Sequence, residues 1–147
     1  MKTVAAFLSL CLSFFLLAPA AAADKDVRWS PEKAKSWATR TGWLAGSNYA
    51  PAYAINQLEM WQAETFDLET IQRELSWAAD SGLNAVRVFL HDLAWQQDPE
   101  GFKKRIGKFL DAADKQHILT TPVIFDDCWN PAPKPGKQPE PKPYFHN

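Results

Sequence analysis

The sequence predicts an α/β fold in which three parallel strands alternate with two long helices. Residues 67–83 and 98–117 carry apolar side chains at helical spacing. Short apolar segments suited to strands flank them, at residues 43–49, 84–90 and 118–126. Because each helix separates two strands and is long enough to cross over a sheet, the strands of this β-α-β-α-β order are expected to run parallel.

The first 23 residues have the organisation of a secretory signal peptide. Lys2 precedes the apolar run VAAFLSLCLSFFLL, and the small residues APAAAA follow it, so we expect cleavage after Ala23 and a secreted or periplasmic protein. The alternative is a membrane anchor, but the apolar run is shorter than the ~20 residues of a membrane span. The formal net charge of −1 gives no electrostatic case for nucleic acid, or for a membrane partner after cleavage.

Residues 24–147 are the expected mature chain, and their single cysteine, Cys128, excludes a disulfide within it. About 120 residues suffice for one small domain with its own core, but not for a large barrel. Without a covalent cross-link, a secreted chain of this size depends on a good hydrophobic core.

The N-terminal part is expected to contain a helix and the first strand. A helix is expected at residues 31–39, with Ser30 before it as the cap and Pro31 at its first position. The strand at residues 43–49 is interrupted by Gly46 and is expected to end near Asn48. Residues 50–66 are expected to form a loop or an irregular turn.

The helix at residues 67–83 has signals at both ends, with Asp67 as the N-cap and Gly82 as the terminating glycine. Its apolar residues recur with the period of one helical face. The predicted buried stripe consists of Leu68, Ile71, Leu75 and Ala78.

The helix at residues 98–117 begins with Asp98 as its cap and a proline at the first helical position. No glycine closes it, so Gln116 or His117 has to make the terminal turn. Its predicted buried stripe consists of Phe102, Ile106, Phe109, Leu110 and Ala113.

The third strand, at residues 118–126, contains Pro122, which lacks a backbone donor. A bulge there, or a strand that starts only at Val123, would accommodate the proline. Residues 130–147 contain six prolines and are expected to adopt polyproline II or irregular structure.

Aromatic and hydrogen-bonding residues follow each predicted strand. In parallel sheets function gathers at the carboxyl ends of strands, and a flat ring beside polar groups suits a sugar. Alternatively, the tryptophans pack the loops onto the sheet. The candidate substrate-binding residues in these segments are Asn48, Trp61, His91, Trp95, Asp126 and Trp129.

Arg87 is a further candidate, because it lies in the middle of an apolar strand. Val86 and Val88 share one face of that strand and suit packing against helices, so Arg87 and Phe89 are expected on the other face. A charge there needs a partner, and Asn48 and His91 are the neighbours expected at this level. The alternative is a solvated residue at an edge.

The stretch GLNAVRVFLHDLAW resembles the second-strand region of retaining glycoside hydrolases in the clan of family 5, the cellulase-like (β/α)8 barrels. The longer run AINQLEMWQAETFDLETIQRELSWAADSGLNAVRVFLHDLAWQQDPEGF and the later VIFDDCW resemble a bacterial subgroup described as cellulase-like or 1,4-beta-xylanase-like. The resemblance covers about residues 29–147.

This resemblance implies a secreted glycosidase of carbohydrate metabolism that acts on β-linked polysaccharide or oligosaccharide. It gives Arg87 the role of contacting the nucleophilic glutamate. The family's acid/base and nucleophile follow strands four and seven, and no residue of this chain matches either. The expectation is therefore an N-terminal fragment with about three βα units of a (β/α)8 (TIM) barrel, inactive alone, with no cofactor and no metal.

The sequence leaves four other interpretations open. A non-catalytic carbohydrate-binding α/β domain is the main alternative. A retaining pair among Asp92, Asp126 and Asp127 would need two carboxyls ~5–5.5 Å apart. A metal site formed by His91, Asp92, Asp126 and His146 matches no compact ligand motif. A flavodoxin-like domain would need a glycine-rich phosphate loop, which is missing after the first strand.

Overall fold

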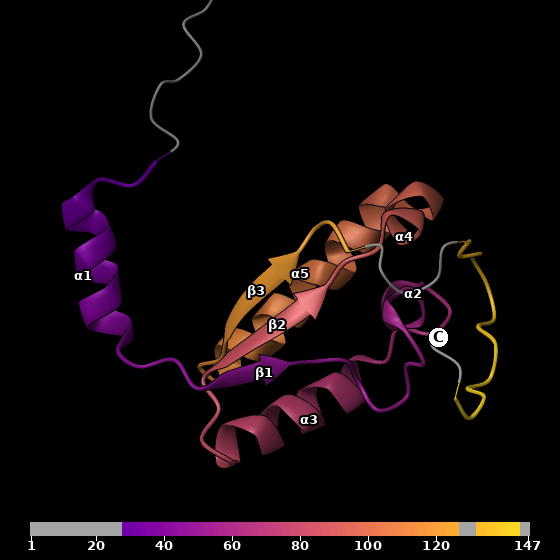
Figure 1. Cartoon of the computed structure of the whole chain (residues 1–147), viewed down its shortest axis with the longest axis horizontal. Helices are drawn as coiled ribbons and strands as arrows, with labels where there is room; N and C mark the ends of the chain where they lie inside the picture. The colour runs from indigo at the N-terminus through magenta and orange to yellow at the C-terminus, as the bar shows by residue number, and fades with distance from the viewer. Residues whose placement is uncertain (1–27, 127–131, 145–147) are drawn as a thin grey trace, which may run out of the picture. The chain divides into compact units, whose positions relative to one another are not determined.

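A computed structural model describes residues 28–126 and 132–144 of the chain (Figure 1). The described residues up to Arg40 and those from Thr41 onward form two compact units, and each is described by itself. The predicted signal peptide, residues 1–23, lies outside the described residues. Among the helices that are described, none is long and apolar enough to cross a membrane.

The first helix, α1 (Pro31–Thr41), confirms the helix predicted at residues 31–39 and extends it by two residues. The Ser30 hydroxyl caps it by accepting a hydrogen bond from the Lys33 amide at 3.2 Å. None of its residues is buried. Gly42 follows with φ +70, the left-handed conformation that commonly ends a helix.

The sheet has three parallel strands in the order β1-β2-β3, which confirms the predicted α/β class and strand direction. They are β1 (Gly46–Asn48), β2 (Ala85–Phe89) and β3 (Leu119–Val123). The register aligns Asn48 with Arg87, and Arg87 with Thr121. Figure 1 shows the three arrows side by side with their carboxyl ends at the same edge.

The two long helices, α3 (Leu68–Asp80) and α5 (Pro99–Lys115), begin at the predicted caps. Asp67 accepts from the Thr70 amide at 3.1 Å, and Asp98 accepts from the Gly101 amide at 2.9 Å. At the end of α5, His117 has φ +56 and makes the turn that glycine usually makes, as expected.

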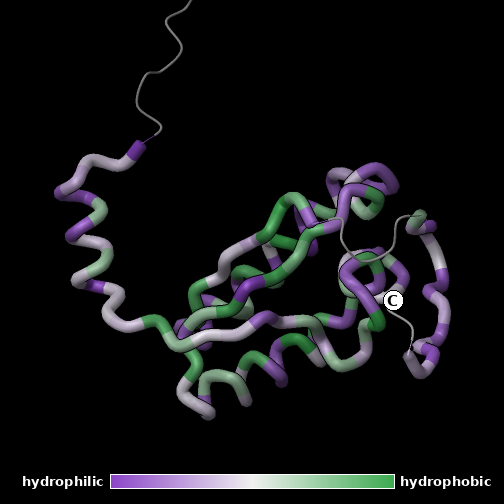
Figure 2. The backbone as a smooth tube through the Cα atoms, in the orientation of Figure 1, coloured by the Kyte–Doolittle hydropathy of each residue, from purple (hydrophilic) through white to green (hydrophobic). Residues whose placement is uncertain are grey.

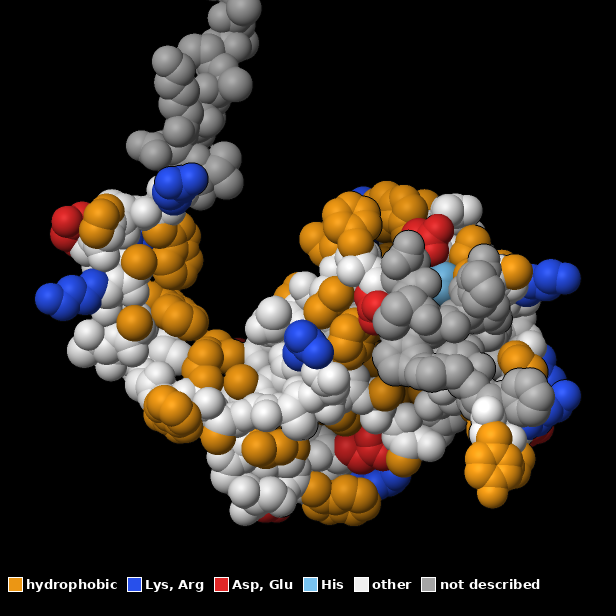
Figure 3. Space-filling view, in the orientation of Figure 1, with side chains coloured by type: hydrophobic (Ala, Val, Ile, Leu, Met, Phe, Trp, Pro, Cys, Tyr) orange, Lys and Arg blue, Asp and Glu red, His pale blue; other side chains and the backbone are white. Residues whose placement is uncertain are grey.

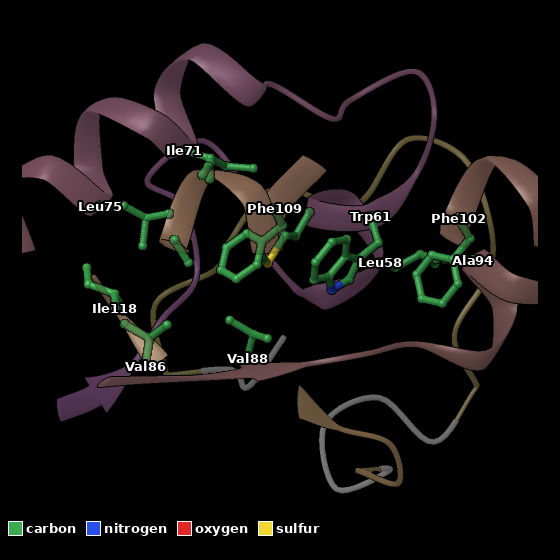
Figure 4. Packing of buried hydrophobic residues seen from close by; sticks show 13 residues of the cluster. Leu58, Trp61, Ile71, Leu75, Val86, Val88, Ala94, Phe102, Phe109 and Ile118 are labelled. Atoms are coloured by element: carbon green, nitrogen blue, oxygen red, sulfur yellow. The ribbon is translucent and has the colours of Figure 1, made fainter. Parts of the chain in front are cut away.

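The core lies between these helices and one face of the sheet. Figure 4 shows Val86 and Val88 of β2 directed toward Ile71 and Leu75 of α3 and toward Phe109 of α5. Within the unit from Thr41 onward, no described helix lies on the opposite face of the sheet. The buried hydrophobic residues are Leu58, Met60, Trp61, Ile71, Leu75, Val86, Val88, Ala94, Phe102, Phe109, Ala112, Ala113 and Ile118.

Two predictions about side chains on the helices were wrong in part. Leu110 was placed in the buried stripe of α5 but is 43% exposed. Arg105 is buried instead, with 9% of its surface exposed. The buried face of α5 is centred on Phe109 and runs toward Arg105, which leaves Leu110 about 100° further round the helix. In α3, Ile71 and Leu75 are buried as predicted, and Leu68 and Ala78 are partly buried against the core.

Two short helices were not predicted. The first, α2 (Gln57–Trp61), lies in the segment expected to be a loop. It is started by a reciprocal cap, in which Asn56 accepts from the Glu59 amide and the Glu59 carboxylate accepts from the Ile55 amide. The second, α4 (Asp92–Gln97), follows β2 directly.

Pro122 lies inside β3, opposite Val88, so the expected bulge or late strand start was wrong. Backbone groups alternate sides along a strand. Leu119 donates to Asn84 and Val123 accepts from Leu90, both toward β2. Pro122 therefore turns its nitrogen to the outer edge, where its missing donor costs no hydrogen bond within the described sheet.

Residues 132–144 contain no helix or strand, as predicted for the proline-rich segment. Figure 2 shows them as mostly hydrophilic. Their connection to the rest of the chain runs through polar contacts with α2, described below.

Candidate functional site

The candidate site lies on the face of the sheet that the helices leave open. Arg87 projects there from β2, opposite to Val86 and Val88, as predicted from the alternation of the strand. Its Nε donates to the Asn48 Oδ1 of the neighbouring strand at 2.8 Å, and its guanidinium lies 5.2 Å from the centre of the Phe89 ring. Arg87 is exposed rather than buried, because this face is uncovered among the described residues.

A shallow, open hollow of about 260 Å³ surrounds this pair on the sheet. The space-filling view of Figure 3 shows a basic side chain, in blue, over β2, surrounded by uncharged and hydrophobic surface. The pairing leaves the other guanidinium nitrogens of Arg87 available to a carboxylate or a sugar hydroxyl. The hollow is lined by Gly46, Ser47, Asn48, Ala85, Val86, Arg87 and Thr121.

His91 stands at the carboxyl end of β2 and caps α4. Its Nδ1 accepts from the Leu93 amide at 3.2 Å, and the same nitrogen lies 3.1 Å from the Asp92 carboxylate. The Asp92 side chain is 72% exposed, so water screens its contact with the His91 ring.

Trp61 lies in the core and not on the surface where a substrate-binding residue was expected. Its side chain is 0% exposed, and its ring contacts Phe102 and Phe109 at centroid distances of 5.9 and 5.7 Å. Its Nε1 donates to the Phe89 carbonyl at 2.7 Å. That carbonyl faces the side of β2 where β1 has already ended, so the indole replaces a missing strand as donor.

Trp95 of α4 is 44% exposed and has part of its ring accessible. Phe102 meets it edge-on at 6.4 Å between centroids, and the Lys103 ammonium lies 5.2 Å from the ring centre. A ligand that stacks on this face has to move Lys103, which is also bound to Glu100 at 2.8 Å.

Asp126, after β3, accepts a hydrogen bond from the Gln57 side chain of α2 at 3.5 Å. This contact ties the carboxyl end of β3 to the segment that follows β1. Trp129, together with the Asp127 and His146 of the other interpretations, lies outside the described residues. No group of three potential metal ligands occurs within the described part of the chain.

The loop after β1 is held by a carboxylate that the sequence did not single out. Glu74 of α3 accepts from the Tyr49 hydroxyl at 2.9 Å and from the Ala52 amide at 3.1 Å. Burial and then the Glu74 carboxylate raise the pKa of Tyr49, so its hydroxyl stays protonated and keeps donating. Burial also raises the pKa of Tyr53, whose hydroxyl accepts from the Asp67 amide.

A second polar cluster was also missed, because its members are far apart in the sequence. Gln62, at the end of α2, and Gln138, in the proline-rich segment, are both buried, with only 2% and 4% of their surfaces exposed. Their bonds fix residues 134–138 beside α2. Glutamines in a predicted loop and a predicted irregular segment carry no signal of burial, so only their pairing in space identifies them.

Comparisons of this chain with models of protein families, with curated proteins and with solved structures find no match.

Proposed function

We propose that this chain is the N-terminal part of a secreted (β/α)8 glycosidase acting on β-linked polysaccharide or oligosaccharide of the cellulose or xylan type. The proposal starts from the resemblance of residues 29–147 to cellulase-like hydrolases. The chain contributes the first three strands and the walls near their carboxyl ends. The two catalytic carboxylates would come from later strands.

The observation that carries the proposal is the Arg87–Asn48 pair on the open face of a parallel sheet. In a (β/α)8 barrel, helices cover the outer face and the inner face is closed by the other strands. Within the unit from Thr41 onward, the long helices pack on one face of the sheet, and the other face carries a cation hydrogen-bonded to a neighbouring strand. A carboxylate from a late strand would pair with the guanidinium nitrogens of Arg87 that the bond to Asn48 leaves available.

The proposed substrate-binding residues are correspondingly Asn48, Arg87, His91, Trp95 and Asp126. Asn48 and Arg87 line the hollow. His91 and Asp126 follow β2 and β3 at the same edge of the sheet, and Trp95 offers a partly exposed ring. Trp61 supports the site from the core and does not touch the sugar.

The first test is the DNA beyond codon 147. We expect an in-frame continuation with a fourth strand followed by Asn-Glu and a further glutamate after a seventh strand. The extended protein should release reducing sugar from xylan or cellulose, whereas the present chain should release none, because it lacks both a nucleophile and a proton donor.

Variants of the extended protein then test the site. Arg87→Lys removes the planar fork and the bond to Asn48, and should lower kcat roughly 100-fold by misplacing the reacting groups. Arg73→Lys, on the exposed face of α3, is the matched control and should leave kcat unchanged. Equal activity of the two variants, or a continuation without the glutamates, refutes the proposal.

The alternative is a non-catalytic carbohydrate-binding domain, which the exposed ring of Trp95 favours. It predicts that the present chain binds xylo- or cello-oligosaccharides and that Trp95→Ala abolishes this binding. Calorimetric titration of the full chain with these oligosaccharides measures the binding. Binding together with an inactive extended protein favours the binding domain, whereas an active extended protein favours the glycosidase.

A further inference from the structure

The proline-rich residues 132–144, called the strap below, are fastened to α2 by side-chain amides. Gln62 and Gly136 form a reciprocal pair: the Gly136 amide donates to Gln62 Oε1 at 2.6 Å, and Gln62 Nε2 donates to the Gly136 carbonyl at 3.0 Å. Gly136 has φ +98, a conformation that glycine adopts without strain. The strap is therefore fixed by a specific contact across 74 residues of sequence.

A second glutamine completes the fastening from the side of the strap. Gln138 accepts from the Asn56 side chain at 2.9 Å and donates to the carbonyls of Gly136 and Lys134 at 2.8 and 3.1 Å. Because Gln62 and Gln138 are buried and both hydrogen-bonded, the amides avoid the cost of unsatisfied polar groups. Such a network fixes one backbone path for residues 134–138.

This fastening does not serve the hydrophobic core. The core cluster runs from Leu58 to Ile118 and contains no residue of the strap. The strap instead stands beside the functional edge of the sheet, because α2 follows the carboxyl end of β1 and its Gln57 contacts Asp126 after β3. Figure 1 shows the strap next to α2, beyond the ends of the strand arrows.

The exposed surface of the strap is cationic. Lys134, Lys137 and Lys142 are exposed, with Glu140 as the single acidic residue between them. None of the three lysines forms an ion pair with any described residue. The whole chain has a formal charge of −1, so this concentration of positive charge is local.

We propose that the lysines of the strap select glycans that carry carboxylate groups, so that the glycan bound at the carboxyl end of the sheet contains uronic acids. This inference rests on the proposed function and narrows its substrate class. The buried amides hold the backbone, and the lysines meet the carboxylates of a β-linked chain. Exposed lysine–carboxylate contacts are individually weak, so three of them give a preference of about five- to tenfold, which falls as salt rises.

The test is affinity electrophoresis of the full chain in gels of glucuronoxylan and of the same polymer after reduction of its carboxyls to alcohols. We expect about five- to tenfold tighter binding to the acidic polymer at low salt. The triple variant Lys134→Gln, Lys137→Gln, Lys142→Gln should lose this preference and keep its binding to the reduced polymer. The control Lys104→Gln, Lys108→Gln, Lys115→Gln makes the same charge change on α5 and should keep the preference.

A further variant, Gln62→Leu, leaves all three lysines and the Asn56–Gln138 bond in place and removes only the paired bonds between Gln62 and Gly136. It should halve or abolish the preference if the lysines act from a fixed backbone. Circular dichroism establishes that each variant remains folded before binding is compared.

Several results would overturn the inference. They are equal binding to acidic and reduced polymer, equal losses in the two triple variants, and equally tight binding to poly-glutamate, which would indicate a general polyanion effect. Binding to both xylans without a preference leaves the proposed function standing. Binding to neither polymer also overturns the inference, because the strap then gives this chain no hold on the glycan, and the proposed function is judged separately by the assay of the extended protein.

Discussion

Replacing Trp61 with phenylalanine separates a role in the core from a role in sugar binding. Trp61 is 0% exposed, and its indole donates to the Phe89 carbonyl at 2.7 Å. Phenylalanine keeps a ring that can contact Phe102 and Phe109, but it cannot donate a hydrogen bond. The substitution therefore removes one specific bond at the end of β2 and leaves space where the second ring of the indole was.

The two losses set the expected magnitude. Leaving a buried carbonyl without its partner costs about 1–3 kcal/mol. The space left by the missing ring atoms adds roughly 1 kcal/mol. Because the carbonyl of Phe89 is only partly buried, we expect the lower part of the sum, about 2–3 kcal/mol. That is a large fraction of the ~5–15 kcal/mol that stabilises a typical domain.

Urea denaturation followed by far-ultraviolet circular dichroism measures this change without depending on the tryptophan signal. Trp95→Phe is the matched control, since its side chain is 44% exposed, and it should change the free energy of unfolding by less than ~0.5 kcal/mol. A Trp61→Phe protein as stable as the wild type would refute the reasoning. So would a loss of glycan binding by this variant with its stability unchanged.

Three further predictions concern the scaffold. Gly46→Ala places a methyl group against the backbone of β2 and should lower the free energy of unfolding by about 1–3 kcal/mol. Its control, Gly107→Ala, lies at an open helical position and should raise the free energy of unfolding by up to ~1 kcal/mol. The opposite order of the two stabilities would contradict the β1–β2 register. Arg105→Met removes the donor to a buried carbonyl and should cost about 1–3 kcal/mol, while the exposed Lys103→Met should cost less than ~0.5 kcal/mol; equal urea midpoints would argue against the buried bond. Asp98 accepts a hydrogen bond from the Gly101 amide and another from Arg105, and these bonds, the first more than the second, lower the pKa of Asp98 in the folded protein. The ionised Asp98 therefore stabilises the fold above its ordinary pKa of 3.8, and this contribution is lost as the pH falls through the lower pKa of the folded state. Asp98→Asn should therefore flatten the acid side of a plot of urea midpoint against pH, and an unchanged acid side would be evidence against this contribution.

The regular elements could be predicted from sequence because their causes are local. Both long helices begin at the predicted caps, Asp67 and Asp98, since a cap bonds an amide three residues away. Arg87 was placed on the face opposite Val86 and Val88, because side chains alternate along a strand whatever lies around it. Asn48 was named as its neighbour because both residues stand at corresponding levels of adjacent strands.

Short helices were harder to predict, because little in their sequences distinguishes them from loops. The cap of α2 uses Asn56 and Glu59, a pair that is readable in retrospect, but the helix itself spans only Gln57–Trp61. A helix this short is not stable on its own propensity and forms because its apolar residues pack into the core. Three of its residues are buried, namely Leu58, Met60 and Trp61.

By itself, the sequence determined the α/β order, the caps and the direction of Arg87, all of which depend on residues within one or two turns or along one strand. Tertiary structure alone decided that Trp61 lies in the core, that Arg105 is buried and Leu110 is not, and that Gln62 holds Gly136. These outcomes depend on which surfaces meet across large sequence separations. An aromatic ring, an arginine or a glutamine suits either water or a satisfied interior, and only its partners in space select between them.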